Sequence, residues 1–528
     1  MRKYYRNKKG AERGVAIITV VGLLLVVLVF AGGLMAQLSM EVQSVKQHGS
    51  SSRALAAADA GIHGMVAAIQ DNAVLRLAPP KVISYTYPEA IGPSTTSYTA
   101  TIDQNWISGS VNYYLITSTG TYDNKVQSKT DRIVKAIVRA QPYTTFASFS
   151  INEVNQFGRA VWYRPDQSFN GPVYSGGPMR IDYNDTKGPI FGSTVQTGNT
   201  PVWNDEIDSG PPSDPGDWDA IIKGGQKAFT IDNTPLALPQ PTDNLSLMSE
   251  AYEGDANATT FPGVANGVYI NKGPAASGSG AITTGIYVNV NGGNVFVDGS
   301  STANTETLVF TSGAKNFGPP VTVTINFGSP GSTTVKQGST QTTYSGVPSG
   351  QPGPGNPNSG NGAIFVNGNM TFGKSSPDVT LHGDYTFGTP DYAGNTGTIV
   401  LNGNLRYFDP INDKTALWAD DVIMNTAASN IEVDASIIAG FPGENWRSGT
   451  FRNIHCGPVT CNAGDQGTLT IFGGLIENSR GALGVWIGNS HFGFSRQINY
   501  DARLAASPPP FNPTTGAFNI VAWDDLGS

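Results

Sequence analysis

Two cysteines and a histidine lie close together near the C-terminal end of the sequence. His455 and Cys456 are adjacent, Cys461 follows after four residues, and the chain has no other cysteine. A structural zinc site normally needs four ligands, and no second Cys-x-x-Cys or His pair accompanies these three. Outside the cytoplasm, cysteines at this spacing favour a small disulfide loop, with free thiols or a three-ligand metal site as alternatives. We expect a Cys456–Cys461 disulfide and no metal.

Carboxylates are the second group that could do chemistry, because glycoside-cleaving enzymes work with acids placed in a groove. None of the candidate acids belongs to a recognisable motif, so we expect turn or solvent roles for Asp384, Asp391, Asp420, Asp421, Glu432 and Asp434. The segment IDYNDTKG offers the oxygen ligands of a calcium site without the spacing of an EF-hand: Asp182, Asn184 and Asp185. The sequence lacks GxxxxGK[ST], GxSxG and HExxH. We expect no catalytic residue, no enzyme activity and no cofactor.

Five basic residues form a cluster that could contact nucleic-acid phosphates: Lys125, Lys129, Arg132, Lys135 and Arg139. Phosphate binding needs a continuous basic stripe on one face. In an alternating strand, Arg132 would face away from Lys135 and Arg139. A solvated strand face is the favoured interpretation, and a DNA-contact patch is the alternative.

The composition is that of an extracytoplasmic β protein of more than one structural unit. The chain has 528 residues, of which only 14% are charged, with 64 glycines and 20 tyrosines. A single core rarely grows past about 250–300 residues. The net charge is -8, although the first 14 residues carry six basic side chains and one acid. The acidic remainder does not favour a general nucleic-acid binder, and a basic start before an apolar run fits the cytoplasmic side of a membrane.

An uncharged, apolar segment runs from Gly14 to Met40 and is long enough to cross a bilayer. A cleaved secretory signal would have a shorter apolar region. A plain signal anchor and a pilin-type helix remain. The helical pattern continues past Met40 until Pro79 and Pro80 end it. We therefore predict one helix over residues 15–78, with an apolar first half and an amphipathic second half that packs on a β-sheet.

The start of this helix resembles the minor type IV pilins and pseudopilins of the PilX and GspK kind, through RGVAIITV at 13–20 and ALAAADAG at 54–61. The resemblance implies that prepilin peptidase cuts after Gly14 and that the new N-terminus, Val15, is methylated. Most pilins carry Glu at the fifth mature position, where this chain has Thr19. GspK-like subunits also lack that Glu and sit at the filament tip. The implied partners are other pilins or pseudopilins, contacted through the helix.

Two kinds of β structure follow the helix. Alternating segments between residues 81 and 141 predict a small antiparallel sheet of four strands. From about residue 146, short apolar runs alternate with Gly/Asn turns, as in FVNGNM at 365–370 and VLNGNL at 400–405. We expect a parallel β-solenoid, in which each coil buries a short strand against the next. Antiparallel sandwiches with Asn-Gly hairpins are the alternative.

The fold class is therefore α+β, with a long pilin-type helix, a small antiparallel sheet and a mainly-β domain. Segments 170–181 and 499–524 resemble large pilin-like proteins with β-solenoid bodies and an inserted lobe, of the competence-linked ComZ kind. We predict six segments: a basic leader (1–14), the helix (15–78), the pilin-like sheet (79–145), the first solenoid part with a Pro-rich acidic loop (146–262), an inserted β lobe with a flexible Gly/Ser/Pro loop (263–361), and the closing solenoid (362–528).

These features predict a minor pilin-like subunit near the tip of a type IV pilus or related assembly. It would pass once through the inner membrane, be processed by prepilin peptidase and then display its β domain on a pilus or cell surface. DNA, for uptake, or a surface polysaccharide, for adhesion, are the ligands considered. A membrane-anchored carbohydrate-active enzyme and a plain signal-anchored surface protein are the alternatives.

Overall fold

The computed structural model divides into two compact units. The first unit holds residues 1–106, 113–139 and 518–528, and the second, called the body below, holds residues 107–112 and 140–517. The structure describes residues 9–71, 81–87, 95–108, 111–124, 128–183, 187–205, 211–212, 214–232, 236–252, 262–270, 282, 284–328, 331–350, 360–374, 376–392, 395–445, 447–488 and 490–527.

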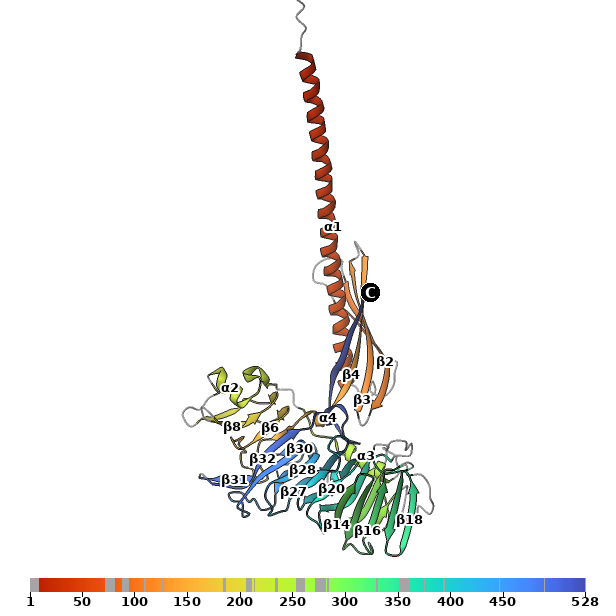
Figure 1. Ribbon diagram of the computed structural model, residues 1–528, viewed down its shortest axis with the longest axis vertical. Helices are drawn as coiled ribbons and strands as arrows, with labels where there is room; N and C mark the ends of the chain where they lie inside the picture. Colours follow the sequence, from red (N-terminus) through yellow and green to blue (C-terminus); the bar gives the residue numbers. More distant parts are fainter. Residues whose placement is uncertain are drawn as a thin grey trace, which may run out of the picture. The chain divides into compact units, whose positions relative to one another are not determined.

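Helix α1 runs from Lys9 to Asp71, and its two halves differ in burial (Figure 1). Every residue from Thr19 to Gly49 is exposed. In the second half, buried side chains recur at intervals of three and four residues and so form one face: Ala54, Ala58, Ile62, Met65 and Ile69. The predicted long N-terminal helix is confirmed: its described part is Lys9–Asp71, which begins before the predicted start at residue 15, and residues 72–78 lie outside the described residues. Pro79 and Pro80, the predicted stop, lie outside the described residues.

The buried face of α1 packs on a five-stranded antiparallel sheet in the order β1-β2-β3-β4-β33. The small antiparallel sheet was predicted with four strands, which are β1 (Lys81–Tyr87), β2 (Thr95–Ser108), β3 (Val111–Asn124) and β4 (Ser128–Pro142). The fifth, β33 (Thr514–Gly527), comes from the C-terminal end. The prediction had placed this segment in the closing solenoid, because the sequence of a strand does not indicate which distant strand it pairs with. Phe518 of β33 packs on Tyr114 of β3, with ring centroids 5.8 Å apart.

Glycines on both surfaces allow the helix and the sheet to approach closely. A Cβ atom on Gly120 of β3 would lie less than 3.0 Å from backbone atoms of Ala54 and Ala58 in α1. On the helix, a Cβ atom on Gly61 would lie less than 3.0 Å from the side chains of Ser118 and Tyr98. The segment around Gly120 therefore has a steric role, since any side chain there would push the helix away.

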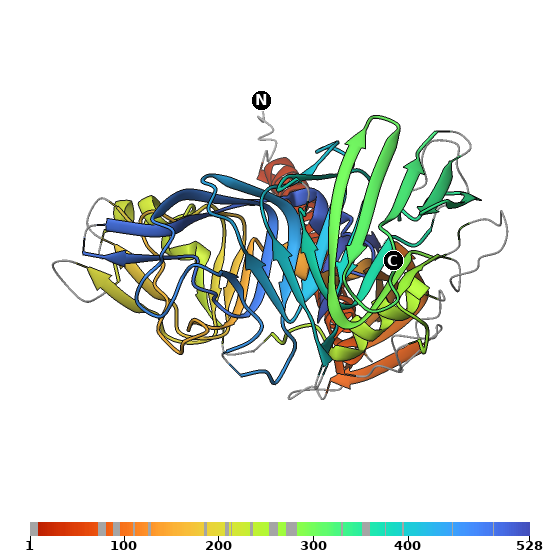
Figure 2. The ribbon, with the colours of Figure 1, turned by 90° about the horizontal axis from the view of Figure 1, so that it is seen from below.

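Most strands of the body pair in parallel and form three ladders (Figure 2). The first ladder runs through β12 (Phe229–Ile231), β10 (Val195–Thr197), β7 (Val173–Ser175), β5 (Ser148–Asn152), β30 (Asp465–Ser479), β28 (Ile431–Ala439), β26 (Lys414–Ala419), β21 (Asp384–Gly388), β19 (Ala363–Phe372) and β14 (Ile286–Thr302). The second runs through β14, β19, β24 (Thr398–Leu401), β27 (Asp421–Met424) and β29 (Phe451–Asn453). The third joins β20 (Val379–Leu381), β25 (Leu405–Tyr407), β28, β30, β32 (Ser490–Tyr500), β6 (Ser168–Asn170) and β9 (Ile190–Phe191).

The order of strands along these ladders differs from their order in the sequence. Ser148 of β5 pairs with Leu475 of β30, and Ser168 of β6 pairs with Gln497 of β32. The first strands of the body therefore lie in the middle of the ladders, between β7 and β9 on one side and the C-terminal strands on the other. The sequence patterns predict individual strands, whereas this order depends on pairings between segments more than 300 residues apart.

A lobe of antiparallel strands is inserted in the body. It continues from the end of β14 through β15 (Thr305–Ser312), β16 (Val321–Asn326), β17 (Ser332–Gln337) and β18 (Thr340–Ser345), each paired with the one before. The Gly/Ser/Pro-rich part of segment 263–361 was predicted to be a flexible loop, but β17 and β18 form within it. Threonine favours strands despite being polar, and Thr333 of β17 is fully buried.

The remaining elements are short. Helix α3 (Pro241–Tyr252) buries Leu247, Met248 and Ala251. The others are helices α2 (Pro215–Ile221) and α4 (Ala502–Ala506), 3-10 turns η1 (Tyr143–Thr145) and η2 (Gly225–Ala228), and strands β8 (Arg180–Tyr183), β11 (Val202–Asp205), β13 (Gly267–Tyr269), β22 (Asp391–Tyr392), β23 (Asn395–Thr396) and β31 (Gly484–Ile487).

Candidate functional site

The predicted processing site lies on α1. Gly14 and Val15 are in the first turns of the helix, and their side chains are outside the described set. Thr19 is exposed, like the apolar residues that follow it. The leader before Lys9 lies outside the described residues. The described part of α1 includes one segment apolar and long enough to cross a membrane, with a mean hydropathy of 2.6.

The described members of the predicted basic cluster all lie on β4: Lys129, Arg132, Lys135 and Arg139. Lys125 lies outside the described residues. The Lys129 ammonium contacts Asp131 at 3.1 Å, and the half-buried Arg132 pairs with Asp525 of β33. Acids thus neutralise two of these charges, which leaves a weaker field for phosphate than the sequence pattern suggested.

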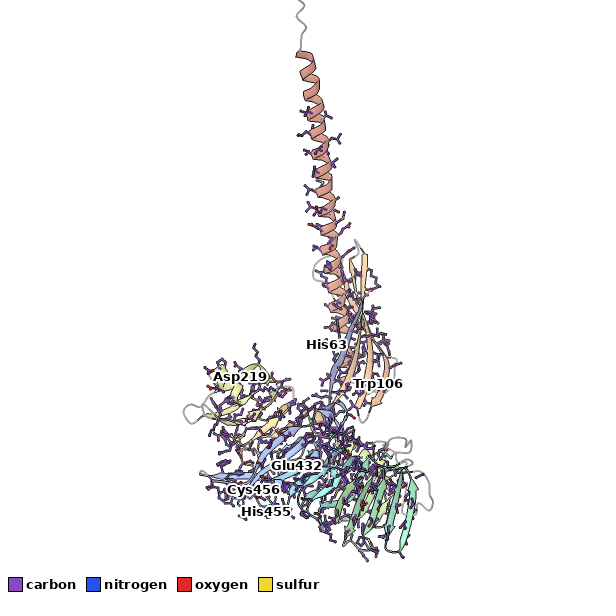
Figure 3. The ribbon with its side chains drawn as sticks, in the orientation of Figure 1. His63, Trp106, Asp219, Glu432, His455 and Cys456 are labelled. Atoms are coloured by element: carbon purple, nitrogen blue, oxygen red, sulfur yellow. A yellow bond between two sulfur atoms is a disulfide. The ribbon has the colours of Figure 1, made fainter. Side chains whose placement is uncertain are left out.

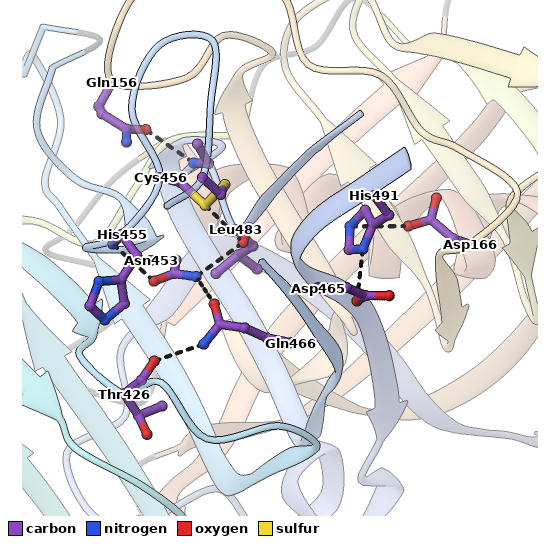
Figure 4. The surroundings of a disulfide bond; sticks show 12 residues. Gln156, Asp166, Thr426, Asn453, His455, Cys456, Asp465, Gln466, Leu483 and His491 are labelled. Atoms are coloured by element: carbon purple, nitrogen blue, oxygen red, sulfur yellow. Dashed lines mark hydrogen bonds and ion pairs between the residues drawn. A yellow bond between two sulfur atoms is a disulfide. The ribbon is translucent and has the colours of Figure 1, made fainter. Parts of the chain in front are cut away.

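The two cysteines are joined by a disulfide, with their Cα atoms 4.0 Å apart (Figure 4). Cys456 Sγ also lies 3.2 Å from the carbonyl oxygen of Leu483. Figure 3 places Cys456 and His455 on the body. Because both sulfur atoms are used in the bond, His455 has no thiolate neighbours with which to share a metal. The loop closed by the disulfide carries Pro458, which lines the pocket described next.

A pocket of about 250 Å³ lies in the body and is lined by several charged side chains. Apart from Pro458, its lining comes from two segments far apart in sequence, residues 155–167 between β5 and β6, and residues 480–496 from the end of β30 through β31 into β32. The pairings of β5 with β30 and of β6 with β32 bring the two segments together. The unexpected strand order of the body therefore creates this site.

Two buried arginines form the floor of the pocket. Arg480 is 1% exposed and Arg496 is 3% exposed. The Arg480 guanidinium carbon lies 3.8 Å from the centre of the Tyr163 ring, a cation–π contact. Its Nη1 lies 3.5 Å from Glu153 Oε2, and Arg496 Nη1 donates to Glu477 Oε1 at 3.1 Å. Each arginine thus has a buried carboxylate partner in the interior.

Burial and charge act against each other in this network. Burial raises the pKa of the Glu477 carboxyl, and the charges of Arg496 and Arg480 oppose that rise. Burial lowers the pKa of Arg496, although Glu477 opposes this. At Arg480 burial also acts against the charge, but Tyr163, Glu153 and Glu477 together raise its pKa. The floor therefore keeps its positive charges because the carboxylates behind it compensate them.

The walls of the pocket are aromatic and polar. Trp162 is half-buried, and Trp486 of β31 is 37% exposed with its ring centroid 5.2 Å from that of His491. His491 lies between two acids, with Nε2 3.9 Å from Asp166 Oδ2 and Nδ1 3.3 Å from Asp465 Oδ1 (Figure 4). Indole faces beside guanidinium groups suit planar or ring-shaped ligands that carry negative charge.

Sequence reasoning missed this pocket. A usable signal was present at Glu477, a charged residue at the end of an apolar run in a chain with only 14% charged residues. Buried charges are rare unless they are paired, so an acid in such a run suggests an internal ion pair. The sequence could not identify Glu153 and Tyr163 as partners of Arg480, because they lie more than 300 positions earlier.

A second cluster consists of acids. Asp391, Asp420 and Glu444 bring one carboxylate oxygen each to within 4.8 Å of one another. The Asp391 side chain is fully buried and accepts a hydrogen bond from Trp418 Nε1 at 2.9 Å. Burial and the charge of Asp420 raise the pKa of Asp391 to about 8, and burial followed by Asp420 raises that of Glu444. These oxygens could coordinate a hard cation such as calcium or share protons.

The expectation of solvent roles is wrong for most of the six candidate acids. Four of them are buried: Asp384, Asp391, Asp421 and Asp434. Asp384 and Asp421 pair with cations, Lys414 and Arg452. Of the suggested calcium ligands, Asp182 lies 3.6 Å from Arg164, whereas Asn184 and Asp185 are outside the described residues.

Comparison of the chain with protein-family models, with curated proteins and with solved structures found no match.

Proposed function

We propose that the chain is a minor pilin-like subunit that joins a type IV pilus or related assembly through α1 and displays the body outside the cell. One observation carries the proposal. The apolar side chains from Val20 to Val45 are exposed in the isolated chain, whereas the next turns of the same helix are buried on a sheet. An apolar helix surface of this size needs a cover. Lipid would supply it before assembly, and the helices of neighbouring subunits afterwards.

Thr19 supports a place at the tip. In the filament the usual acid at this position is taken to pair with the N-terminal amine of a neighbour. A subunit with threonine at this position places no carboxylate in the lipid, where a carboxylate is costly without a partner. It therefore needs no N-terminal amine from a neighbouring subunit at this position. A large body on the same chain also suits the end of a filament, where it has room.

We also infer that the three parallel ladders are the faces of a β-solenoid. The chain visits the ladders in a fixed order, since β19 contributes to the first and second, β20 to the third, and β21 returns to the first. The next strands β24, β25 and β26 repeat this order. Such a body is rigid enough to carry a binding surface away from the membrane.

The mass of the N-terminal peptide in the native membrane or sheared-filament fraction tests the proposal. A peptide that begins at Val15 with an added methyl group is expected, and substitution Gly14→Leu should abolish it. Gly10→Leu in the same leader is the matched control and should leave processing unchanged. A peptide that still begins at Met1 would make the chain a signal-anchored protein, and a start far beyond Met40 would make it a secreted one.

A further inference from the structure

We propose that the Arg480 pocket binds a carboxylated sugar unit, such as the uronate of an acidic polysaccharide. The inference goes beyond the proposed function and does not depend on it, because a signal-anchored surface protein would carry the same pocket. Three properties of the described residues lead to this ligand: the charge of the lining, its unsatisfied polar atoms and its aromatic walls.

The charge of the lining selects an anion. The lining includes four arginines and one carboxylate among its described residues, namely Arg159, Arg164, Arg480, Arg496 and Asp166. The carboxylates that compensate the floor, Glu153 and Glu477, are 2% and 0% exposed and lie in the interior. Arg164 also lies 3.6 Å from Asp182, which offsets its charge. A ligand in the pocket therefore meets chiefly Arg159, Arg480 and Arg496, whose planar guanidinium forks match carboxylates.

The unsatisfied atoms select a ligand that both accepts and donates hydrogen bonds. Arg480 Nε is a buried donor without a hydrogen-bond partner among the described residues. Asp166 Oδ1 and Gln167 Oε1, in the same lining, are buried acceptors that also lack one there. Buried polar atoms are normally satisfied, so each of these needs a partner that is not part of the described chain. A carboxylate accepts from the arginine, and sugar hydroxyls donate to the two acceptors.

The shape favours one sugar ring over a nucleic acid. A volume of about 250 Å³ lies below the usual range for small-molecule sites and so suits a single ring. Trp162 and Trp486 can stack on the apolar face of a pyranose. A deoxyribose-phosphate backbone would satisfy the arginines, but it carries only acceptors and would leave Asp166 and Gln167 unsatisfied. The observations therefore favour an acidic polysaccharide over DNA.

Titration of the full-length protein in detergent micelles with oligogalacturonate tests the proposal. Fully methyl-esterified oligogalacturonate, with nearly the same shape and hydroxyls but no charge, is the matched ligand. We expect the acid to bind and the ester to bind at least about tenfold more weakly, or about 1.4 kcal/mol. Equal binding of both, or no binding of the acid, would overturn the proposal.

Variants locate the binding. Trp486→Ala and Arg159→Gln change exposed side chains of the pocket and should each weaken oligogalacturonate binding by about tenfold. Trp523→Ala, which removes a similarly exposed tryptophan on β33 of the first unit, should leave it unchanged. A short DNA duplex serves as competitor. Displacement of the oligogalacturonate by DNA, or binding that survives both pocket substitutions, would refute the assignment.

Discussion

The body buries carboxylates in two places, and the groups beside them carry opposite charges. At the pocket floor, Glu477 and Glu153 each face an arginine. In the acidic cluster, Asp391 lies beside Asp420 and Glu444, and it accepts a hydrogen bond from the neutral indole of Trp418. Both Glu477 and Asp391 are fully buried, so burial alone does not decide their charge. The difference shows that a neighbouring cation opposes the rise in pKa that burial causes, whereas a neighbouring acid adds to it.

Asp391→Asn should produce the largest change, in the pH dependence of stability. The pKa of Asp391 is about 8 in the folded chain and about 4 in an unfolded one. Between these values the folded state binds one more proton, so stability falls as pH rises from about 4 to about 8, by about 1.4 kcal/mol per pH unit. The substitution should reduce the slope of the unfolding free energy against pH by about this amount, while Glu306 and Glu444, whose pKa values burial also raises, keep their own contributions.

Asp219→Asn, at an exposed acid of the same body, is the control and should leave the slope as it is. A slope that persists unchanged in Asp391→Asn would mean that Asp391 is ionised throughout, and the contrast between the two clusters would be lost.

Glu477→Leu should have the next largest effect. It leaves Arg496 buried without its carboxylate, which costs about 3–5 kcal/mol. Glu432→Leu is a matched comparison, because Glu432 also pairs with an arginine, at 2.8 Å from Arg406, but on the surface. Loss of an exposed pair costs about 0–1 kcal/mol. Similar losses for both variants in denaturant unfolding would show that burial does not distinguish these pairs.

The double variant Glu477→Leu with Arg496→Met tests the same pair from the other side. Replacing a buried ion pair by apolar residues of similar size is often neutral. We expect the double variant to recover all but about 1–2 kcal/mol of the wild-type stability. A double variant as unstable as Glu477→Leu alone would indicate that Arg496 serves chiefly as a partner of other groups, such as the Gly481 carbonyl oxygen.

Removal of the disulfide should have a smaller effect than Glu477→Leu, and a local one. The loop from Cys456 to Cys461 is short, and loop-closure entropy alone predicts a loss of about 2 kcal/mol for Cys456→Ala with Cys461→Ala. Because Pro458 lines the pocket, hydrogen exchange should increase in residues 455–462 and 482–486 while the acidic cluster keeps its protection. A reductant should reproduce this in the wild type and have no effect on the variant. Increased exchange throughout the body would contradict a local role.

The sequence predicted the features that depend on neighbouring residues. The charge-free run after Gly14 predicted the helix, and the spacing of Cys456 and Cys461 predicted their bond. The features that depend on distant partners were missed, because neither β33 nor Glu153 carries a local sign of the residues it meets. The pocket belongs to this second class, since Arg480 meets Glu153 only after more than 300 intervening residues have folded.

The return of β33 to the first sheet has a mechanical consequence. The chain leaves the first unit after Arg139 and returns to it at Phe518. The body is therefore connected to the first unit at both of its ends and not through one linker alone. The two strands that carry these anchors, β4 and β33, are neighbours in the sheet. A single cut by a protease, or the rupture of one strand under tension, would leave the body attached through the other. The two anchors therefore make the attachment of the body to the first unit redundant.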